Sequence, residues 1–386
     1  MSSLSFSTER LDWLRRKVAS DVESGVYWGG AFKIARHGKV EFDEAIGYED
    51  SAHSRSLATN SVFSLLSITK AFTNVLVLRA IEQGRFSFTT KMVDLIPEFK
   101  GTPRDKATIY HFLTHTTGMP GVWVAKPGGT PTDDLSAAVE AVCQFVQGNI
   151  EPGVRCDYSP MANHTLLAEV LRRTDPHDRG FVSIVREDLF EPLGMVDTHF
   201  GVPATVRDRF VFPDRRGMIG VGAPYRENDD NPPAPYNDAP YNELAHSGAS
   251  STTGDLMRFA EMLRNGGELD GVRILSPRMI RMARQNQTGD LPNELYMTVA
   301  LRAGYDVPPA YMGLGFNLRG PKLCAAQFGT MTSAETFGNY GSGSTVFWVD
   351  PEHDITFVGL TAGLMDQAQN ITRFQQLADI VMGAAL

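Results

Sequence analysis

The chain has 386 residues, of which 42% are hydrophobic and 21% charged, and its formal net charge is −9. This is ordinary globular composition, and the length corresponds to two domains or to one large domain with an insertion. An acidic chain without a basic run argues against nucleic acid and anionic lipid as partners. Three cysteines, Cys143, Cys156 and Cys324, argue against a disulfide framework and indicate a reducing compartment.

The N-terminal segment lacks the pattern of a signal peptide, because residues 1–10 show no basic start followed by an apolar core. No stretch approaches about eighteen consecutive apolar residues, so no transmembrane helix is expected. We therefore expect a cytoplasmic protein that binds neither a membrane nor nucleic acid.

Both ends of the chain combine strands with amphipathic helices. A first helix is predicted where apolar residues recur at helical spacing: Leu11, Leu14, Val18 and Val22. Residues 31–36 and 39–47 flank a turn with Gly38 and predict a hairpin, as do residues 344–349 and 355–360. A last helix places these residues on one face: Ile371, Phe374, Leu377, Ala378 and Val381.

The middle of the chain has a different pattern from the two ends. Helix-like runs, such as residues 165–173 and 182–190, are broken there by turns with proline and glycine. The sequence therefore predicts an α/β (α+β) protein: one antiparallel sheet built from both chain ends, flanked by helices. Residues 1–85 and 245–386 would form this sheet domain, and residues 86–244 a mostly helical inserted domain.

Two segments are candidate pocket walls. Residues 224–240 are too rich in proline and asparagine for a helix or a central strand, so they predict a long surface loop. Such a loop is often a lid, and a harmless insertion is an equal alternative. Residues 119–134 are the second candidate.

Ser67 and Lys70 form a Ser-x-x-Lys motif, which places the hydroxyl and the ammonium on one face of a helix. A nearby cation stabilises an alkoxide and helps a base to take the hydroxyl proton. About one such motif is expected by chance in a chain of this length at average residue usage.

The setting of the motif is more informative. Residues 68–81 are apolar around most of the helix circumference and stop before Gly84, which indicates a buried helix. A lysine near the start of such a helix must be paired or must change its protonation state. The alternative, at even odds from these residues alone, is a lysine that reaches the surface beside a capping serine.

Six ordered motifs resemble the serine β-lactamase and penicillin-binding-protein superfamily, and most of all class C β-lactamases and family VIII carboxylesterases. The match spans nearly the whole chain. The motifs are SVFSLLSITK at 61–70 with EQGRFS at 82–87, FLTHTTGM at 112–119, PG at 152–153 with DYS at 157–159, EPLGM at 191–195 with DT at 197–198, STTGDLMRF at 251–259, and FGNYGSGST at 337–345 with WVDP at 348–351.

The resemblance implies the β-lactamase-like fold and a role for individual residues. Ser67 would be the nucleophile that forms an acyl-enzyme, Lys70 its electrostatic partner, and Tyr158 the general base. Because a free tyrosine has a pKa of about 10, Lys70 would have to favour the Tyr158 phenolate. The backbone N–H groups of Ser67 and Ser342 would form the oxyanion hole.

Other catalytic arrangements find less support. His115 suggests a Ser-His-Asp triad, but in the resembling family this histidine belongs to a structural turn. No Gly-x-Ser-x-Gly nucleophile elbow and no His-Glu-x-x-His zinc motif occur in the sequence. We therefore expect neither a metal nor a cofactor, and treat the cysteines as small apolar residues.

Two departures from the β-lactamase pattern bear on the substrate. The Tyr-x-Asn element ends in Pro160, so its amide is missing, although Asn163 lies nearby in the sequence. The Lys-Thr-Gly element reads Asn339, Tyr340 and Gly341, which are the candidate substrate-binding residues. Loss of that lysine removes a charge-assisted contact to an anionic antibiotic. Gly341 would let the strand approach the substrate closely.

The sequence therefore predicts a serine carboxylesterase that acts on a small-molecule ester. The same residues could catalyse β-lactam hydrolysis, D-amino-acid peptidase chemistry or acyl transfer, because function depends on the pocket rather than on the fold. The alternative from another class is a catalytically silent binding protein on the same scaffold.

Overall fold

The computed structural model describes residues 5–121, 133–212 and 239–386. A six-stranded antiparallel sheet joins the two ends of the chain, in the order β2-β1-β12-β11-β10-β9. Both predicted hairpins are confirmed, and β1 from the first hairpin pairs with β12 from the second. The strands are β1 (Gly29–Arg36), β2 (Lys39–Gly47), β9 (Asn317–Leu318), β10 (Phe337–Gly341), β11 (Thr345–Asp350) and β12 (Ile355–Ala362).

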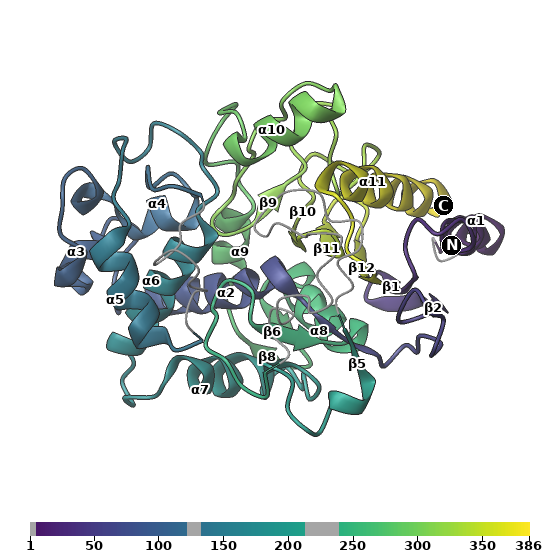
Figure 1. The fold of residues 1–386 in the computed structure, drawn as a ribbon, viewed down its shortest axis with the longest axis horizontal. Helices are drawn as coiled ribbons and strands as arrows, with labels where there is room; N and C mark the ends of the chain where they lie inside the picture. Colours follow the sequence, from purple (N-terminus) through teal and green to yellow (C-terminus); the bar gives the residue numbers. More distant parts are fainter. Residues whose placement is uncertain (1–4, 122–132, 213–238) are drawn as a thin grey trace.

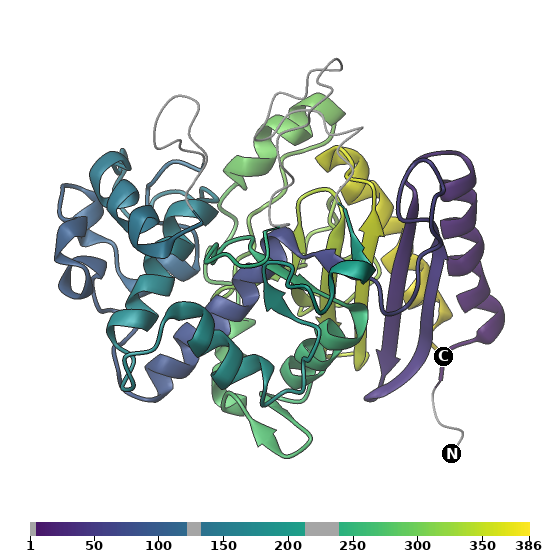
Figure 2. The same ribbon diagram turned by 60° about the horizontal axis from the view of Figure 1, so that its bottom comes forward.

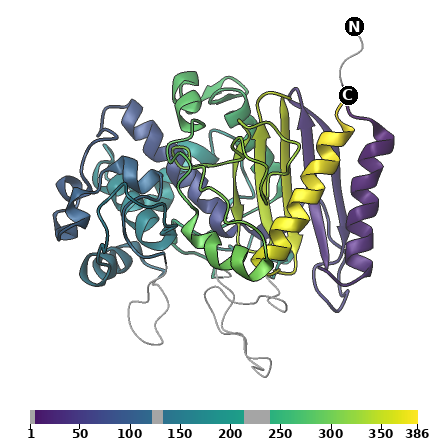
Figure 3. The same cartoon turned by 90° about the horizontal axis from the view of Figure 1, so that it is seen from above.

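Helices cover both faces of this sheet. The two predicted terminal helices, α1 (Thr8–Glu23) and α11 (Gln367–Ala384), lie side by side on one face (Figure 3), and α8 (Thr253–Arg264) packs against the other. Side chains of a strand alternate between the two layers, so Phe357 of β12 packs with α1 and α11 while the adjacent Val358 faces the layer of α8. This alternation explains why the central strands β11 and β12 are buried along their whole length.

The shorter helices from the middle of the chain gather at the end of the molecule away from the two termini (Figures 1 and 2). They are α3 (Met92–Leu95), α4 (Ile109–Leu113), α5 (Leu135–Phe145), α6 (Pro160–Arg173) and α7 (Phe181–Val185). The run at 165–173 lies within α6 as predicted, whereas the run at 182–190 divides between α7 and a π-helical turn, Arg186–Phe190.

A second, four-stranded sheet mixes segments from both parts of the chain. It consists of β3 (Val62–Ser64), β4 (His199–Phe200), β5 (Phe210–Val211) and β6 (Ala249–Ser251), in the order β4-β6-β3-β5. The division into a sheet domain and an inserted helical domain stays a prediction.

The central helix α2 (Thr69–Glu82) connects the sheet with the helical region, and it is buried around its circumference as predicted. Phe72 illustrates this, because its ring makes edge contacts with Phe190 at 5.0 Å and with Phe259 at 4.9 Å. Full burial of such a side chain contributes about 1.5–3 kcal/mol. The helix is thus a rigid support for the residues at its N-terminal end.

The remaining elements are β7 (Glu268–Leu269), β8 (Val272–Arg273), α9 (Pro277–Ala283) and α10 (Glu294–Ala303). In the described ranges, no helix is long and apolar enough to cross a membrane. Most of the two candidate pocket walls, residues 119–134 and 224–240, lies outside the described residues.

Candidate functional site

Ser67 lies in a single 3-10 turn, Leu66–Ile68, directly before α2, and it is half-buried. Leu66, the residue before it, has a φ of +50°, a left-handed conformation that leucine rarely adopts. Strained backbone of this kind persists only where the surroundings impose it. The turn presents the Ser67 side chain at the end of a helix that is buried on all sides.

The segment around His246 anchors the first turn of α2. The backbone N–H of Ala249 donates to Thr69 Oγ1 at 3.1 Å, and the Nζ atom of Lys70 donates to the carbonyl oxygen of His246 at 2.8 Å. These two contacts connect residues about 180 positions apart in the chain. The spacing of the Ser-x-x-Lys motif alone could not reveal this partner.

Lys70 is 3% exposed, and among the described residues it forms no ion pair with a carboxylate. Burial therefore lowers the pKa of Lys70 well below the ordinary lysine value. The sequence left two alternatives, a buried lysine and a lysine that reaches the surface. The structure has the buried one.

Tyr158 and Ser67 lie near each other although they are far apart in the sequence. The Ser67 side chain lies close enough to the Tyr158 phenol to affect its pKa, and the Nζ atom of Lys70 lies 5.2 Å from the centroid of the Tyr158 ring. Burial raises the pKa of Tyr158, and this outweighs the opposite effect of the Ser67 hydroxyl. This direction is opposite to the effect expected of Lys70, whose own pKa burial lowers, and the role of Tyr158 as the general base stays a prediction.

The His115 ring packs against the Tyr158 ring. Its Nδ1 atom accepts a hydrogen bond from the Ser159 N–H at 3.2 Å, and the His115 and Tyr158 rings are 4.7 Å apart. The amide of Asn163 contacts the same Nδ1 atom at 3.2 Å. The Asn163 side chain is therefore engaged with His115. These contacts agree with a structural role for His115.

Two further histidines, His164 and His246, lie close to Lys70, and sequence reasoning missed both. Burial, together with the lysine charge, lowers the pKa of His115 and of His246 to about 3. The same causes lower the pKa of His164 well below its ordinary value. The surroundings of Lys70 thus consist of neutral imidazoles rather than of counter-charges.

The end of β10 approaches the turn that carries Ser67. A Cβ atom added to Gly341 would collide with the Thr345 hydroxyl and lie 2.5 Å from the Leu65 carbonyl oxygen. Only glycine fits this contact. The next residue, Ser342, accepts a hydrogen bond at its Oγ atom from Gln367 Nε2 at 2.9 Å, which ties the turn to α11.

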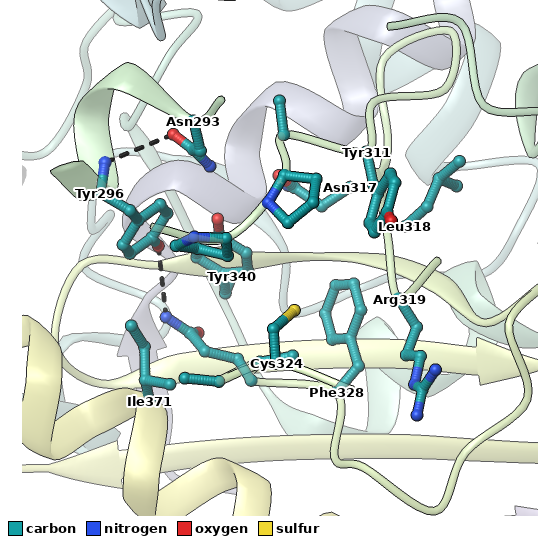
Figure 4. A pocket seen from close by; sticks show the side chains of 16 residues that line it. Asn293, Tyr296, Tyr311, Asn317, Leu318, Arg319, Cys324, Phe328, Tyr340 and Ile371 are labelled. Atoms are coloured by element: carbon teal, nitrogen blue, oxygen red, sulfur yellow. Dashed lines mark hydrogen bonds between the residues drawn. The ribbon is translucent and has the colours of Figure 1, made fainter. Parts of the chain in front are cut away.

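The neighbouring side chains of β10 point to opposite sides. Asn339 is 4% exposed, and its amide contacts the side chain of Asn317 at 3.0 Å and the carbonyl of Gly315 at 3.4 Å. Tyr340 instead lines a cavity (Figure 4), and its ring lies 6.0 Å from the ring of Tyr296 of α10. Tyr296 has no motif signature, because it comes from a helix that only the fold places here.

Within the described ranges, no three His, Cys, Asp or Glu side chains are grouped closely enough to hold a metal ion. The prediction that neither a metal nor a cofactor is needed remains a prediction.

The family model for Beta-lactamase matches residues 14–381, which is nearly the whole chain. This chain belongs to the beta-lactamase family. The fold agrees, since the chain superposes on a penicillin-binding protein homologue from Caulobacter crescentus with a TM-score of 0.77 and 23% identity, covering 98% of this chain and 99% of that one.

Two curated relatives extend this comparison. Protein Rv1367c from Mycobacterium tuberculosis H37Rv is 25% identical over 381 residues, covering 91% of this chain and 89% of the relative. Esterase EstB from Burkholderia gladioli is 32% identical over 206 residues, covering 49% of this chain and 51% of EstB. One of the similar proteins is thus named as an esterase.

Proposed function

We propose that this chain is a serine carboxylesterase that cleaves small-molecule esters through an acyl-enzyme on Ser67. The observation that carries the proposal is the position of Lys70, a buried lysine without an acidic partner among the described residues, 5.2 Å from the centroid of the Tyr158 ring and beside Ser67. A hydroxyl needs a base in order to attack a carbonyl, and a desolvated amine is such a base near neutral pH.

The proton path follows from the two pKa directions. Tyr158 stays protonated near neutral pH because its pKa is raised, while the lowered pKa of Lys70 favours the neutral amine. We propose that Tyr158 takes the Ser67 proton as it passes its own proton to Lys70. The Ser67 oxygen bonds to the ester carbonyl carbon, and the N–H groups of Ser67 and Ser342 stabilise the oxyanion.

In the later steps the proton is returned from the pair of Tyr158 and Lys70. The tetrahedral intermediate collapses when the bond between the carbonyl carbon and the alcohol oxygen breaks, and Tyr158 protonates the leaving alcohol. A water molecule then attacks the acyl-enzyme while the pair of Tyr158 and Lys70 takes its proton. Release of the carboxylic acid restores the Ser67 hydroxyl.

The asparagine at position 339 favours a neutral substrate over an anionic one. Its buried amide offers no positive charge at the position where the β-lactamase pattern has a lysine. An anionic β-lactam would lose a charge-assisted contact, whereas a neutral ester loses nothing. The partial similarity to EstB points in the same direction.

The test is Ser67→Ala, assayed with p-nitrophenyl acetate and butyrate. Exposed Ser136→Ala on α5 is the matched control, and it should retain full activity. Labelling of Ser67 by a fluorophosphonate, measured as intact mass, separates the esterase from a silent binding protein. Full activity of Ser67→Ala would overturn the proposal, and nitrocefin turnover much faster than ester turnover would favour a β-lactamase.

We also propose a cytoplasmic location. Its support is that Cys143, Cys156 and Cys324 are all free thiols, as expected for a protein kept in a reducing compartment. Fractionation of the native host cells tests this, and co-purification with secreted markers would contradict it.

A further inference from the structure

Asn74 and His164 form a buried polar contact between the helix that carries Lys70 and the helix that follows Tyr158. Asn74 lies on α2, four residues after Lys70. His164 lies on α6, six residues after Tyr158. The two side chains belong to residues that are 2% and 1% exposed, and the Nε2 atom of His164 lies 3.1 Å from Asn74 Oδ1. Polar groups buried to this degree are costly unless they are hydrogen-bonded.

The hydrogen bonds of Asn74 fix the orientation of its amide. Its Nδ2 atom donates to the carbonyl oxygen of Gly315 at 2.8 Å, so its Oδ1 atom faces His164. An amide oxygen can only accept, so the proton of this contact comes from His164 Nε2. Burial lowers the pKa of His164, which keeps the ring neutral with a single N–H group. Its Nδ1 atom, 3.3 Å from the Pro160 carbonyl oxygen, is then the unprotonated nitrogen.

Gly315 connects the same amide with the strand that leads to Ser342. Its carbonyl oxygen also accepts a hydrogen bond from Asn339 Nδ2 of β10 at 3.4 Å. Gly315 has a φ of +86°, and a Cβ atom added to it would lie 2.6 Å from the Cβ atom of Asn74, so only glycine fits this contact. The Asn74 amide and the Gly315 carbonyl therefore join α2, α6 and β10.

Ring contacts continue from His164 to the proposed proton path. The His164 and His115 rings are 5.6 Å apart, and the His115 and Tyr158 rings are 4.7 Å apart. The Nζ atom of Lys70 in turn lies 5.2 Å from the centroid of the Tyr158 ring. Because Lys70 and Asn74 are four residues apart on one face of α2, these contacts form a closed circuit around the phenol and the amine. A displacement of His164 must therefore alter the distance between these two groups.

We propose that Asn74 and His164 are positioning residues, whose hydrogen bond holds the phenol and the amine of the proposed proton path at the distance that proton transfer needs. The inference rests on the proposed ester hydrolysis at Ser67. Because both side chains are almost fully buried, they act through the two helices rather than by touching the substrate. Proton transfer needs groups within hydrogen-bond reach, so loss of the contact lowers kcat more than it changes KM.

Two substitutions of His164 separate its hydrogen bond from the bulk of its ring. His164→Phe keeps a ring and loses the N–H donor, whereas His164→Gln loses the ring and keeps an N–H donor. We expect kcat for p-nitrophenyl butyrate to fall by about 10- to 100-fold in His164→Phe, with KM changed by less than about twofold. His164→Gln should retain most of the wild-type kcat. Wild-type kcat in His164→Phe, or equal losses in both variants, would overturn the inference.

Asn74→Ala removes the same contact from the side of α2, and alanine is the best helix former. It should lower kcat about as much as His164→Phe does. The double variant should be no worse than either single variant, because both substitutions remove one shared contact. Additive losses in the double variant would show that the two side chains act independently, which contradicts the proposed pair.

Thr332→Val is the matched control for the cost of a lost buried hydrogen bond. Thr332 is 4% exposed, lies between β9 and β10, and donates from its hydroxyl to the Phe328 carbonyl oxygen at 2.9 Å. Like His164→Phe, this substitution leaves a buried oxygen without its donor, so the melting temperature should fall in both variants. The kcat of Thr332→Val should stay at the wild-type value. An equal loss of kcat in Thr332→Val would assign the effect to stability alone and overturn the inference.

Labelling of Ser67 by a fluorophosphonate separates this inference from the proposed reaction, because it reports activation of the hydroxyl and needs no ester. The labelling rate, measured as intact mass, should fall in His164→Phe and be retained in His164→Gln. If the wild-type protein hydrolyses no ester but shows this pattern, the ester assignment fails and the positioning assignment stands. If esters are hydrolysed but His164→Phe labels and turns over as the wild-type protein does, the positioning assignment fails alone.

Discussion

The Nζ atom of Lys70 lies 5.2 Å from the centroid of the Tyr158 ring, on its face. This position keeps the buried amine close to the phenol that adjoins Ser67. The first prediction concerns the lysine of this pair.

Lys70→Met should lower kcat/KM for p-nitrophenyl esters by about 10²- to 10⁴-fold, the usual contribution of a general base. The melting temperature should change little, because an apolar side chain of similar length replaces a buried amine while its hydrogen bond to the His246 carbonyl is lost. The exposed Lys91 offers a control, and Lys91→Met should change neither quantity. A stable Lys70→Met protein with wild-type kinetics would contradict the assigned role.

The activity should also depend on pH through Lys70. Because burial lowers its pKa well below 10.5, the neutral amine that serves as base is present at pH values where ordinary lysines are charged. As pH falls through the lowered pKa, protonation removes the base and kcat/KM should decrease. A pH profile of kcat/KM measures this, and a decrease centred on the pKa of an ordinary lysine would exclude Lys70.

Acid should destabilise the fold through the histidines around Lys70. The pKa values of His115 and His246 are lowered to about 3 in the folded protein, so these rings stay neutral while the unfolded chain takes up protons below about 6.5. The unfolding free energy should therefore fall between about pH 6.5 and pH 3, by at most about 1.4 kcal/mol per pH unit for each histidine.

Urea unfolding at several pH values measures this slope. His115→Gln should flatten it, whereas the same change at the exposed His177 should leave it as in the wild-type protein. Identical slopes for wild type and His115→Gln would show that His115 takes no part in the acid response.

Gly341→Ala should damage both the fold and the activity. The added Cβ would collide with the Thr345 hydroxyl and lie 2.5 Å from the Leu65 carbonyl oxygen, so β10 must move away from the Ser67 turn. Overpacking of this kind costs about 1–3 kcal/mol, and the proposed oxyanion donor at Ser342 moves with the strand. Thermal unfolding and ester kinetics test the two effects. Gly383→Ala, where nothing lies within 4 Å of the added Cβ, should be close to neutral.

Much of the architecture could be predicted from the sequence because it depends on local periodicity. The spacing of Leu11, Leu14 and Val18 indicates α1, and the apolar circumference of residues 68–81 indicates the buried helix α2. The Ser-x-x-Lys spacing likewise places Ser67 and Lys70 one helical turn apart. Ordered motifs added the family and the candidate Tyr158, which lies about 90 positions further along the chain.

The tertiary structure alone decided the electrostatics of the candidate site. Burial lowers the pKa of Lys70 because α2 is enclosed on all sides, and the same desolvation raises the pKa of Tyr158. Gln327 and Tyr296 come from segments without any motif, and only the packing of α10 and α11 against β10 brings them beside Tyr340. Periodicity and motifs report the identity and spacing of residues along the chain, whereas burial and proximity depend on contacts between distant segments.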